Sequence, residues 1–273
     1  MDYMKAIDLM YCERVIDLSN PNIIPLNIDT TSKGNQQKYY DTENKMYIKE
    51  QFKYQNTLWC DYKVEYLSCI ISNMLNTNIP VLQQDIVKLS NGRLCCISKD
   101  FAIDKQYVAL AKFNEYRELV KHRGKSFKVF KGILDIMLKC NITKDVAEEY
   151  LFVMIILDYL LGNEDRHYNN IGLLYSNKTN EFSICPLFDF GIGLFEHDNK
   201  YKNKPLHQCI AMMDGKPFDE DLSKPIQIIK NINISKVKSI CCNITIPNKD
   251  LFPNDLSYEY FQLAYMNLME GLK

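Results

Sequence analysis

The order of apolar and polar positions along the chain predicts a strand-rich first part with one helix. Short apolar or alternating runs predict strands at residues 46–52, 81–89 and 93–98. The last two runs are joined by Ser90-Asn91-Gly92, which favours a tight hairpin turn. Apolar residues at helical spacing predict an amphipathic helix at residues 61–76.

From residue 104 onward the pattern changes to that of helices. Residues 151–161 are almost wholly apolar, which indicates a buried helix, and Gly162 is well suited to end it in a left-handed conformation. Thr143 is the expected N-cap of this helix. The helices expected in this part of the chain are 105–121, 127–139, 143–161, 216–231 and 257–272.

A hairpin is predicted after the buried helix. Residues 171–175 and 182–188 have the pattern of strands, and the polar residues 176–180 between them favour a turn. With the turn centred between Thr179 and Asn180, Asn170 would lie directly opposite Asp189. Opposed residues on one face have Cβ atoms roughly 5 Å apart, so two oxygen ligands could share one hard cation.

The loop before the hairpin concentrates acidic and amide side chains in residues 162–170. An acidic base, an amide ligand and an aspartate ligand are the polar groups that phosphoryl transfer from ATP requires. Asp165 would orient or deprotonate the attacking hydroxyl, while Asn170 and Asp189 hold magnesium. Asn and Asp are also common in ordinary turns, but that explains less well an Asp-Phe-Gly predicted opposite the loop.

Two charged residues of the first part fit the same chemistry. Lys49 lies in a predicted strand, and Glu65 borders the apolar stripe of the predicted helix. Each alone would ordinarily be solvated. A strand lysine followed by a helix glutamate is, however, the order in which kinases hold a lysine on the α- and β-phosphates. The strand edge at residues 96–99 would offer backbone groups to adenine, with a hinge at 99–101.

Composition and charge give no reason to expect nucleic acid or a membrane as a partner. The 273 residues are 47% hydrophobic, enough for a sizeable core, and the formal net charge is -1. The basic residues 121–125 lack interleaved aromatics and are expected to form a solvated helix connection. The N-terminus lacks the apolar core of a signal peptide, and Asp158 interrupts the longest apolar run. A soluble, cytoplasmic protein is therefore expected.

The ten cysteines do not form a recognisable metal or redox motif. No two of them have C-x-x-C spacing, and no histidine lies at zinc-finger spacing from them. Reduced and mostly buried thiols are therefore expected.

Four segments together resemble the HipA-like serine/threonine kinases, and more closely their compact, CtkA-like members. The catalytic loop N-x-D-x-H-x-x-N of that family is similar to residues 163–170, and its metal motif to Phe188-Asp189-Phe190-Gly191. Gly34-x-Gln36-x-Lys38 looks like the family's phosphate loop, and Lys49 and Glu65 resemble its lysine and helix glutamate. The resemblance extends over residues 31–231, and the catalytic loop with the following Asp is its specific part.

The resemblance implies an α+β, two-lobed protein-kinase-like fold that uses ATP and Mg²⁺. A small, β-rich, ATP-binding N-lobe would comprise residues 1–101, and a mainly helical C-lobe residues 102–273. The acceptor would be a Ser or Thr hydroxyl of a protein. The expected site residues are catalytic Asp165, His167 and Lys49; nucleotide-binding Gly34, Gln36, Lys38, Lys49, Glu65, Ile97 and Lys99; and metal-binding Asn170 and Asp189.

The resemblance also implies a range of biological roles. Relatives serve as toxins, effectors or regulators, so an antitoxin or regulatory protein is an implied partner, and secretion without a signal peptide is an alternative to a cytoplasmic location. In HipA-like kinases a serine of the phosphate loop can be autophosphorylated. Here Lys33 replaces the serine that often precedes the loop glycine, which leaves Thr31 or Ser32 as the nearest acceptors. The extra N-terminal subdomain of full-length HipA proteins is not expected in a chain of this length, so their DNA-bound complexes are not implied.

Two other functions stay open at this point. Small-molecule phosphotransferases of the aminoglycoside or choline kinase type share the two-lobed fold, but usually have His two positions before the catalytic Asp, where this chain has Asn163. A nucleotide-binding interaction protein without turnover would carry the same motifs. Its biological output would not depend on Asp165.

Overall fold

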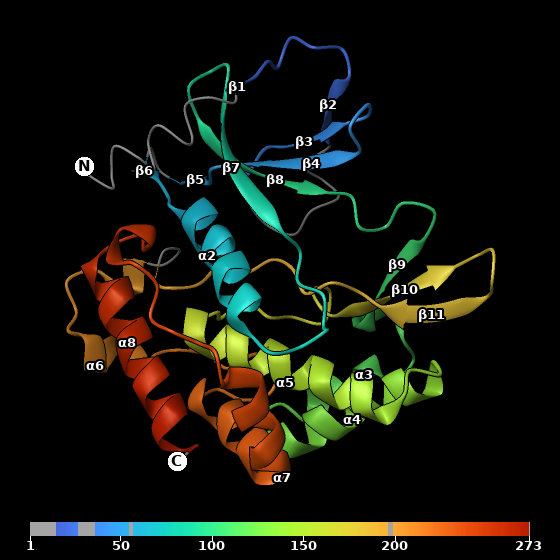
Figure 1. The fold of residues 1–273 in the computed structure, drawn as a ribbon, viewed down its shortest axis with the longest axis vertical. Helices are drawn as coiled ribbons and strands as arrows, with labels where there is room; N and C mark the ends of the chain where they lie inside the picture. Colours follow the sequence, from blue (N-terminus) through green and yellow to red (C-terminus); the bar gives the residue numbers. More distant parts are fainter. Residues whose placement is uncertain (1–14, 27–35, 55–56, 196–198, 273) are drawn as a thin grey trace.

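The computed structural model describes residues 15–26, 36–54, 57–195 and 199–272. Figure 1 shows a small part rich in strands packed on a larger part that is mainly helical. The α+β fold expected from the sequence, with strands first and helices after, is confirmed. None of the helices in the described part of the chain combines the length and the apolar composition of a membrane span.

The small part contains a curled six-stranded sheet. Neighbouring strands are antiparallel except for the parallel pair β1 and β7. One face of the sheet has its own apolar core, formed around Ile48, Leu89 and Ile97. The strands follow one another in space in the order β1 (Val15–Ile16), β7 (Gln84–Leu89), β8 (Leu94–Lys99), β4 (Met46–Glu50), β3 (Lys38–Asp41) and β2 (Ile23–Leu26), and a separate ribbon is formed by β5 (Lys53–Tyr54) and β6 (Thr57–Leu58).

Helix α2 (Asp61–Met74) joins the small part to the helical part. Val64, Leu67 and Ile71 are fully buried and recur at helical spacing, as the sequence predicts. The helix packs on β7 and β8 at one side and on α5 at the other, as Figure 1 shows. Residues of α2 are therefore positioned to contact both parts.

Helix α5 (Lys144–Leu161) forms the centre of the helical part. It contacts α2, α4, α7 and α8, and nearly all of its second half is buried, as expected of a helix that is apolar on all sides. It ends at Gly162 in a left-handed conformation (φ 56°). Thr143 occupies the N-cap position, but its side chain makes no capping hydrogen bond. The surrounding helices are α3 (Tyr116–Lys121), α4 (Ser126–Lys139), α6 (Leu206–Ile210), α7 (Ser223–Cys241) and α8 (Asp255–Glu270), with short 3₁₀ turns η2 (Leu110–Lys112), η3 (Asn199–Tyr201) and η4 (Lys249–Leu251).

The expected helix at residues 105–121 is wrong for most of its length. Its first residues form β9 (Gln106–Ala109), which pairs with β10 (Gly172–Ser176), and the chain becomes α-helical only in α3, after the short 3₁₀ turn η2. The β-branched and aromatic residues of β9 suit a strand, and pairing with β10 overrides the helical periodicity. The expected helix at 216–231 begins later, at Ser223, and extends to Cys241 with a non-helical Asn233 inside it.

The hairpin exists, but its register is not the expected one. In β10 and β11 (Glu181–Ile184) the pairs run from Ser176 with Glu181 to Leu173 with Ile184, so the turn is centred one residue earlier. Asn180 takes a left-handed conformation, and its N–H donates to Ser176 O, which fixes this turn. The ladder ends before residue 170, so the prediction that Asn170 and Asp189 are a pair of the ladder is wrong.

Candidate active site

Lys49 contacts two carboxylates from different elements. Its Nζ lies 2.8 Å from Glu65 Oε1 on α2 and 3.0 Å from Asp189 Oδ1, which follows the hairpin. Burial by itself would lower the pKa of Lys49, but Asp189 and Glu65 raise it well above its usual value. Burial would raise the pKa of Asp189, but Lys49, Lys38 and Arg166 hold it well below its usual value. Lys49 and Asp189 are therefore both charged at neutral pH.

Both carboxylate oxygens of Glu65 accept hydrogen bonds that hold the side chain in place. The side chain is 1% exposed, and Oε2 accepts hydrogen bonds from Gln84 Nε2 at 2.8 Å and from Phe190 N at 3.1 Å. A Cβ at Gly191 would lie 3.1 Å from Glu65 Oε1, so a glycine lets the backbone come this close. The glutamate thus connects α2, the sheet and the segment after Asp189.

The register of β3 and β4 places a second lysine next to the first. Lys38 pairs with Lys49, so the two side chains share one face of the sheet. Burial lowers the pKa of Lys38, the positive charge of Lys49 lowers it further, and Asp189 and Glu65 partly offset both effects. Two cations therefore lie on the side of the site that the sheet forms.

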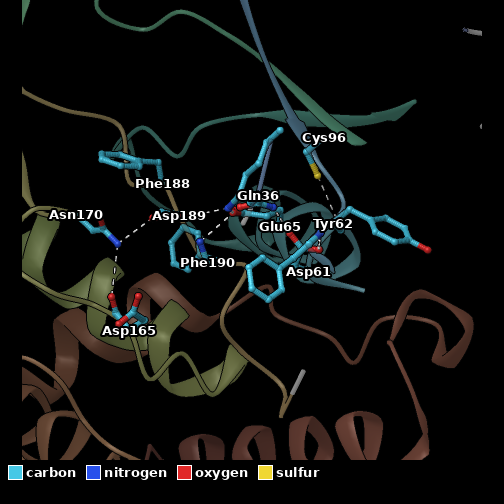
Figure 2. Close-up of polar contacts among 12 residues, drawn as sticks. Gln36, Asp61, Tyr62, Glu65, Cys96, Asp165, Asn170, Phe188, Asp189 and Phe190 are labelled. Atoms are coloured by element: carbon cyan, nitrogen blue, oxygen red, sulfur yellow. Dashed lines mark hydrogen bonds and ion pairs between the residues drawn. The ribbon is translucent and has the colours of Figure 1, made fainter. Parts of the chain in front are cut away.

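The side-chain amide of Gln36 donates hydrogen bonds to two other residues. Its Nε2 donates to Asp61 Oδ2 at 2.7 Å and to Glu50 O at 2.8 Å, and Figure 2 shows it beside Asp61 and Glu65. The same Asp61 carboxylate accepts from Phe52 N at 3.1 Å. Burial raises the pKa of Asp61 to about 6, although Lys49 offsets part of this effect. Gln36 was expected to bind the nucleotide, but its amide hydrogens donate to protein acceptors here.

Residues 31–35 of the expected phosphate loop lie outside the described residues. They include Gly34 and the two candidate acceptors of autophosphorylation, Thr31 and Ser32. Their roles stay predictions.

Asn170 of the catalytic loop contacts Asp189 through its side chain, without strand pairing between the two residues. Its Nδ2 donates to Asp189 Oδ2 at 3.0 Å and reaches Asp165 O at 3.5 Å, as Figure 2 shows. Asp189 takes a left-handed conformation (φ 62°), which turns its side chain toward Asn170 and Lys49. Beyond Ile184 the chain has left β10, and Leu187 instead bridges to Val81. Loop conformation, rather than strand pairing, joins the two residues.

The donor set of Asn170 and Asp189 fits a magnesium ion shared with a ligand. Carboxylate and amide oxygens are hard ligands, and Mg²⁺ usually takes one or two protein ligands together with phosphates and water. Within the described residues no cluster of three or more His, Cys, Asp or Glu could hold a metal by itself. The residues therefore suit an ion held together with nucleotide phosphates rather than a closed protein cage.

Asp165 lies between two basic side chains that both stay outside hydrogen-bond distance. His167 Nε2 is 3.9 Å from Oδ2, and Lys216 Nζ is 3.8 Å from Oδ1. Burial raises the pKa of Asp165, an effect that His167 and Lys216 partly offset. His167 Nδ1 is buried and has no hydrogen-bond partner in the described part of the chain. The catalytic role expected of His167 therefore stays a prediction.

Arg166 is a positioning residue that the sequence reasoning missed. It is completely buried, its Nε and Nη2 donate to Asp158, and its guanidinium lies 4.5 Å from the centre of the Phe190 ring. Its Nη1 donates to Phe188 O at 2.6 Å and to Asn170 O at 3.3 Å. Arg166 thus ties Asn170 and the residue before Asp189 to Asp158 of α5. Asp158 was the available signal, because a charge inside an apolar helix needs a buried partner.

The predicted strand edge for adenine is wrong at residues 96–98. Strand β8 is interior, paired with β4 on one side and β7 on the other, and the Ile97 side chain is buried in the core of the sheet. Lys99 ends the strand and pairs only with Met46. Free backbone groups begin at the strand end, so Lys99 stays a candidate and Ile97 does not.

The linker that follows β8 is bonded to the catalytic loop. Tyr107 Oη donates to Asn169 O at 2.8 Å, Leu110 N donates to Ile171 O at 2.8 Å, and Ala111 N donates to Tyr168 O at 3.2 Å. The strand that enters the helical part thus lies against the loop that carries Asp165.

A kinase of known structure resembles this chain in both sequence and structure. The serine/threonine-protein kinase CtkA of Helicobacter pylori strain J99 is 29% identical over 188 residues, which cover 68% of this chain and 55% of CtkA. The crystal structure of the H. pylori kinase CtkA matches with a TM-score of 0.58 and 20% identity, over 94% of this chain and 98% of that structure. This chain has the fold of CtkA. The expected two-lobed, kinase-like fold and the resemblance to CtkA-like proteins are thereby confirmed.

The remaining findings of the comparisons add little to this result. The match in sequence to CtkA spans little more than half of that protein's length. HipA of Shewanella oneidensis MR-1, in a complex with HipB and operator DNA, gives a TM-score of 0.44 and 13% identity over 94% of this chain and 72% of HipA, and no argument rests on it. No family model matches the chain.

Proposed function

We propose that this chain is an ATP- and magnesium-dependent serine/threonine protein kinase of the HipA-like type. The observation that carries the proposal is the contact of Lys49 with both Glu65 and Asp189, next to Asn170 and Asp165. These are the polar parts that phosphoryl transfer uses, gathered from both parts of the fold. The similarity to CtkA, a serine/threonine-protein kinase, supports the same conclusion.

The sheet side of the site would bind the nucleotide. Lys49, charged and held by Glu65, would contact the α- and β-phosphates, and Lys38 would add a second positive charge. Asn170 and Asp189 would hold Mg²⁺, which when bound neutralises charge on the β- and γ-phosphates. In this proposal the lobes comprise residues 1–101 and 102–273, and adenine meets the backbone from Lys99 onward.

The loop side would handle the acceptor. Asp165 would accept a hydrogen bond from the attacking hydroxyl and receive its proton as the new phosphate ester forms. Its carboxylate is 36% exposed, so an incoming hydroxyl can reach it. Arg166 would keep this loop aligned with the segment that carries Asp189.

Transfer of γ-labelled phosphate with magnesium tests the activity. We expect wild-type protein to label itself or a generic protein acceptor on Ser or Thr. The variants Asp165→Ala and Asp189→Ala should lose the label, whereas Glu118→Ala, which removes an exposed ion pair of α3, should keep it. Wild type that binds ATP but labels only aminoglycosides or choline would instead indicate a small-molecule phosphotransferase. Binding without any transfer would indicate a nucleotide-binding interaction protein.

We further propose a cytoplasmic toxin, effector or regulator that phosphorylates a protein and is itself controlled by an antitoxin or regulatory protein. Induced expression of wild type and Asp165→Ala in a bacterial host tests this role. Growth arrest by the wild type alone would support a toxin whose effect depends on transfer. Equal growth of both cultures would argue for another role. Equal arrest by both would point to an effect that needs no chemistry.

A further inference from the structure

Lys216 approaches the proposed base from outside the catalytic loop. Its Nζ lies 3.8 Å from Asp165 Oδ1, whereas His167 faces the other oxygen. No hydrogen-bond acceptor for this ammonium is found among the described residues. The side chains of Lys216 and Asp165 are 38% and 36% exposed, so a substrate group can reach both. The lysine therefore has donors available next to the position of the attacking hydroxyl.

The backbone before Lys216 is anchored to the catalytic loop. Asp214 N donates to Glu164 Oε1 at 2.9 Å, and Glu164 directly precedes Asp165. The Asp214 carboxylate pairs with Arg123 Nη2 at 2.6 Å. Glu164 also accepts from Lys200 Nζ at 3.0 Å and from the hydroxyl of Tyr201. These contacts tie the segment carrying Lys216 to the loop carrying Asp165.

The backbone after Lys216 is anchored as well. Phe218 is buried, its N–H donates to Gly215 O at 3.0 Å, and its carbonyl accepts from Gly124 N at 3.1 Å. A Cβ at Gly215 would lie 2.7 Å from Asp221 O, so this turn packs closely on the start of α7. With both flanks fixed, the backbone of Lys216 is held at a position from which its side chain reaches Asp165.

The charges around the site are divided between its two sides. Lys49 and Lys38 lie on the sheet side, where the nucleotide phosphates are expected. Lys216 lies on the loop side, next to the group that would hold the acceptor. The phosphoryl group carries negative charge throughout its transfer between these sides, and fixed cations along its path stabilise the transition state.

We propose that Lys216 is a further catalytic residue, which contacts the phosphoryl group as it passes to the acceptor. In this step the bond from the γ-phosphorus to the β,γ-bridging oxygen breaks and ADP leaves. A bond from phosphorus to the acceptor oxygen forms, and the hydroxyl proton goes to Asp165. Lys216 stays protonated and donates to a phosphoryl oxygen. The proposal rests on the proposed kinase function.

Single-turnover transfer and a mimic of the transferring group test this role together. Lys216→Ala should slow phosphoryl transfer on the order of 100-fold, the size of effect seen when one donor to a transition-state oxygen is lost. It should weaken binding of ADP with aluminium fluoride, which mimics the phosphoryl group in flight, by a similar factor. Affinity for ATP should change less than about twofold, because that contact forms only during transfer. Lys216→Arg should recover most of the rate.

The matched control is Lys224→Ala, which removes an exposed lysine eight residues further along. It should transfer phosphate and bind the mimic like the wild type. Equal rates for wild type and Lys216→Ala would overturn the inference, as would a slow Lys216→Ala that binds the mimic normally. A wild type without any transfer would overturn the proposed function itself, and this inference with it.

Discussion

Lys49 and Asp189 are 140 positions apart in the sequence, yet the Lys49 Nζ and Asp189 Oδ1 atoms lie 3.0 Å apart. The contact joins strand β4 of the sheet to the segment that follows the hairpin of the helical part. Glu65 on α2 accepts from the same Nζ, so three elements meet at one ammonium group. The polar centre of the site is therefore also a point where the two parts of the fold are held together.

Removal of Glu65 should destabilise the fold. In Glu65→Ala, Lys49 would lose a partner, and Gln84 Nε2 and Phe190 N would lose their acceptor inside the protein. We expect a loss of about 3 kcal/mol in the free energy of unfolding, as for other broken buried pairs. Urea unfolding measures it. Glu118→Ala at an exposed pair is the control and should show no measurable loss. Equal stability of the two variants would contradict a structural role for Glu65.

Variants at Arg166 can separate its effect on the stability of the fold from its effect on the position of the catalytic loop. Arg166→Met alone would leave Asp158 charged and unpaired in the interior, at a cost of about 3 to 5 kcal/mol. The double variant Asp158→Asn with Arg166→Met removes both charges, keeps an acceptor oxygen for Asn163 Nδ2, and should recover much of the stability. Its transfer activity should stay low, because Phe188 O and Asn170 O would still lack their donor. Thermal unfolding and transfer rates of both variants check this, and a fully active double variant would exclude the positioning role.

Asp61 should make folding less favourable as the pH rises. Its pKa is raised from 3.8 to about 6, so its charge costs nothing below pH 4, and the cost grows between pH 4 and 6 and is complete above. At 1.36 kcal/mol per pKa unit the full cost is roughly 3 kcal/mol. Asp61→Asn removes it. The stability of the variant relative to wild type, measured by urea unfolding, should therefore increase from pH 4 to pH 6.5. A difference that does not change with pH would be inconsistent with a raised pKa.

The hydrogen bonds of Asp61 suggest why a carboxylate that destabilises the fold is present at this position. It accepts from Gln36 and from Phe52 N, and Asn has one acceptor oxygen for these two donors. Asp61→Asn should therefore bind ATP more weakly, although it removes the buried charge. ATP titration at pH 7.5 measures this. Tight binding by the variant would show that the contact to Gln36 is dispensable.

Gly193 should be intolerant of any side chain. A Cβ there would lie 2.4 Å from Leu161 O, the carbonyl that accepts from Leu194 N. Gly193→Ala should displace the segment after Asp189 and lower phosphate transfer more than tenfold. Gly92→Ala is the control, because it adds a Cβ at a turn with a positive φ and open space around it. That variant should lose about 1 to 2 kcal/mol of stability and keep the activity. Normal transfer by Gly193→Ala would contradict the importance of this close packing.

Much of the site could be predicted because its chemistry is carried by residue types in a fixed order. Lys49, Glu65, Asn170 and Asp189 were named from the sequence, and the structure brings them together. The route to one contact was wrong, since Asn170 and Asp189 meet through the left-handed conformation of Asp189 and not through the hairpin register. A one-residue shift of the turn is decided by Asn180, and the sequence pattern does not resolve it.

The remaining errors arise where tertiary contacts overrule a local pattern. The sequence pattern around residues 106–109 predicts a helix, but these residues pair with β10. The sequence pattern alone does not reveal that pairing partner. Ile97 lies on an interior strand, a fact that depends on the order of strands in the sheet. Arg166 looked like one more charged loop residue, because its burial depends on Asp158 in the preceding helix.

The bonds from Tyr107, Leu110 and Ala111 to the catalytic loop determine which side of the protein can move. The linker from the sheet is fastened to the loop before it reaches α3. If the sheet tilts to admit or release a nucleotide, the pivot therefore lies on the sheet side of these bonds. In such a movement Asp165, Asn170 and Arg166 would keep their positions relative to one another. Lys49 would move with the sheet, so the distance between Lys49 Nζ and Asp189 Oδ1 would report how far the sheet has moved toward the helical part.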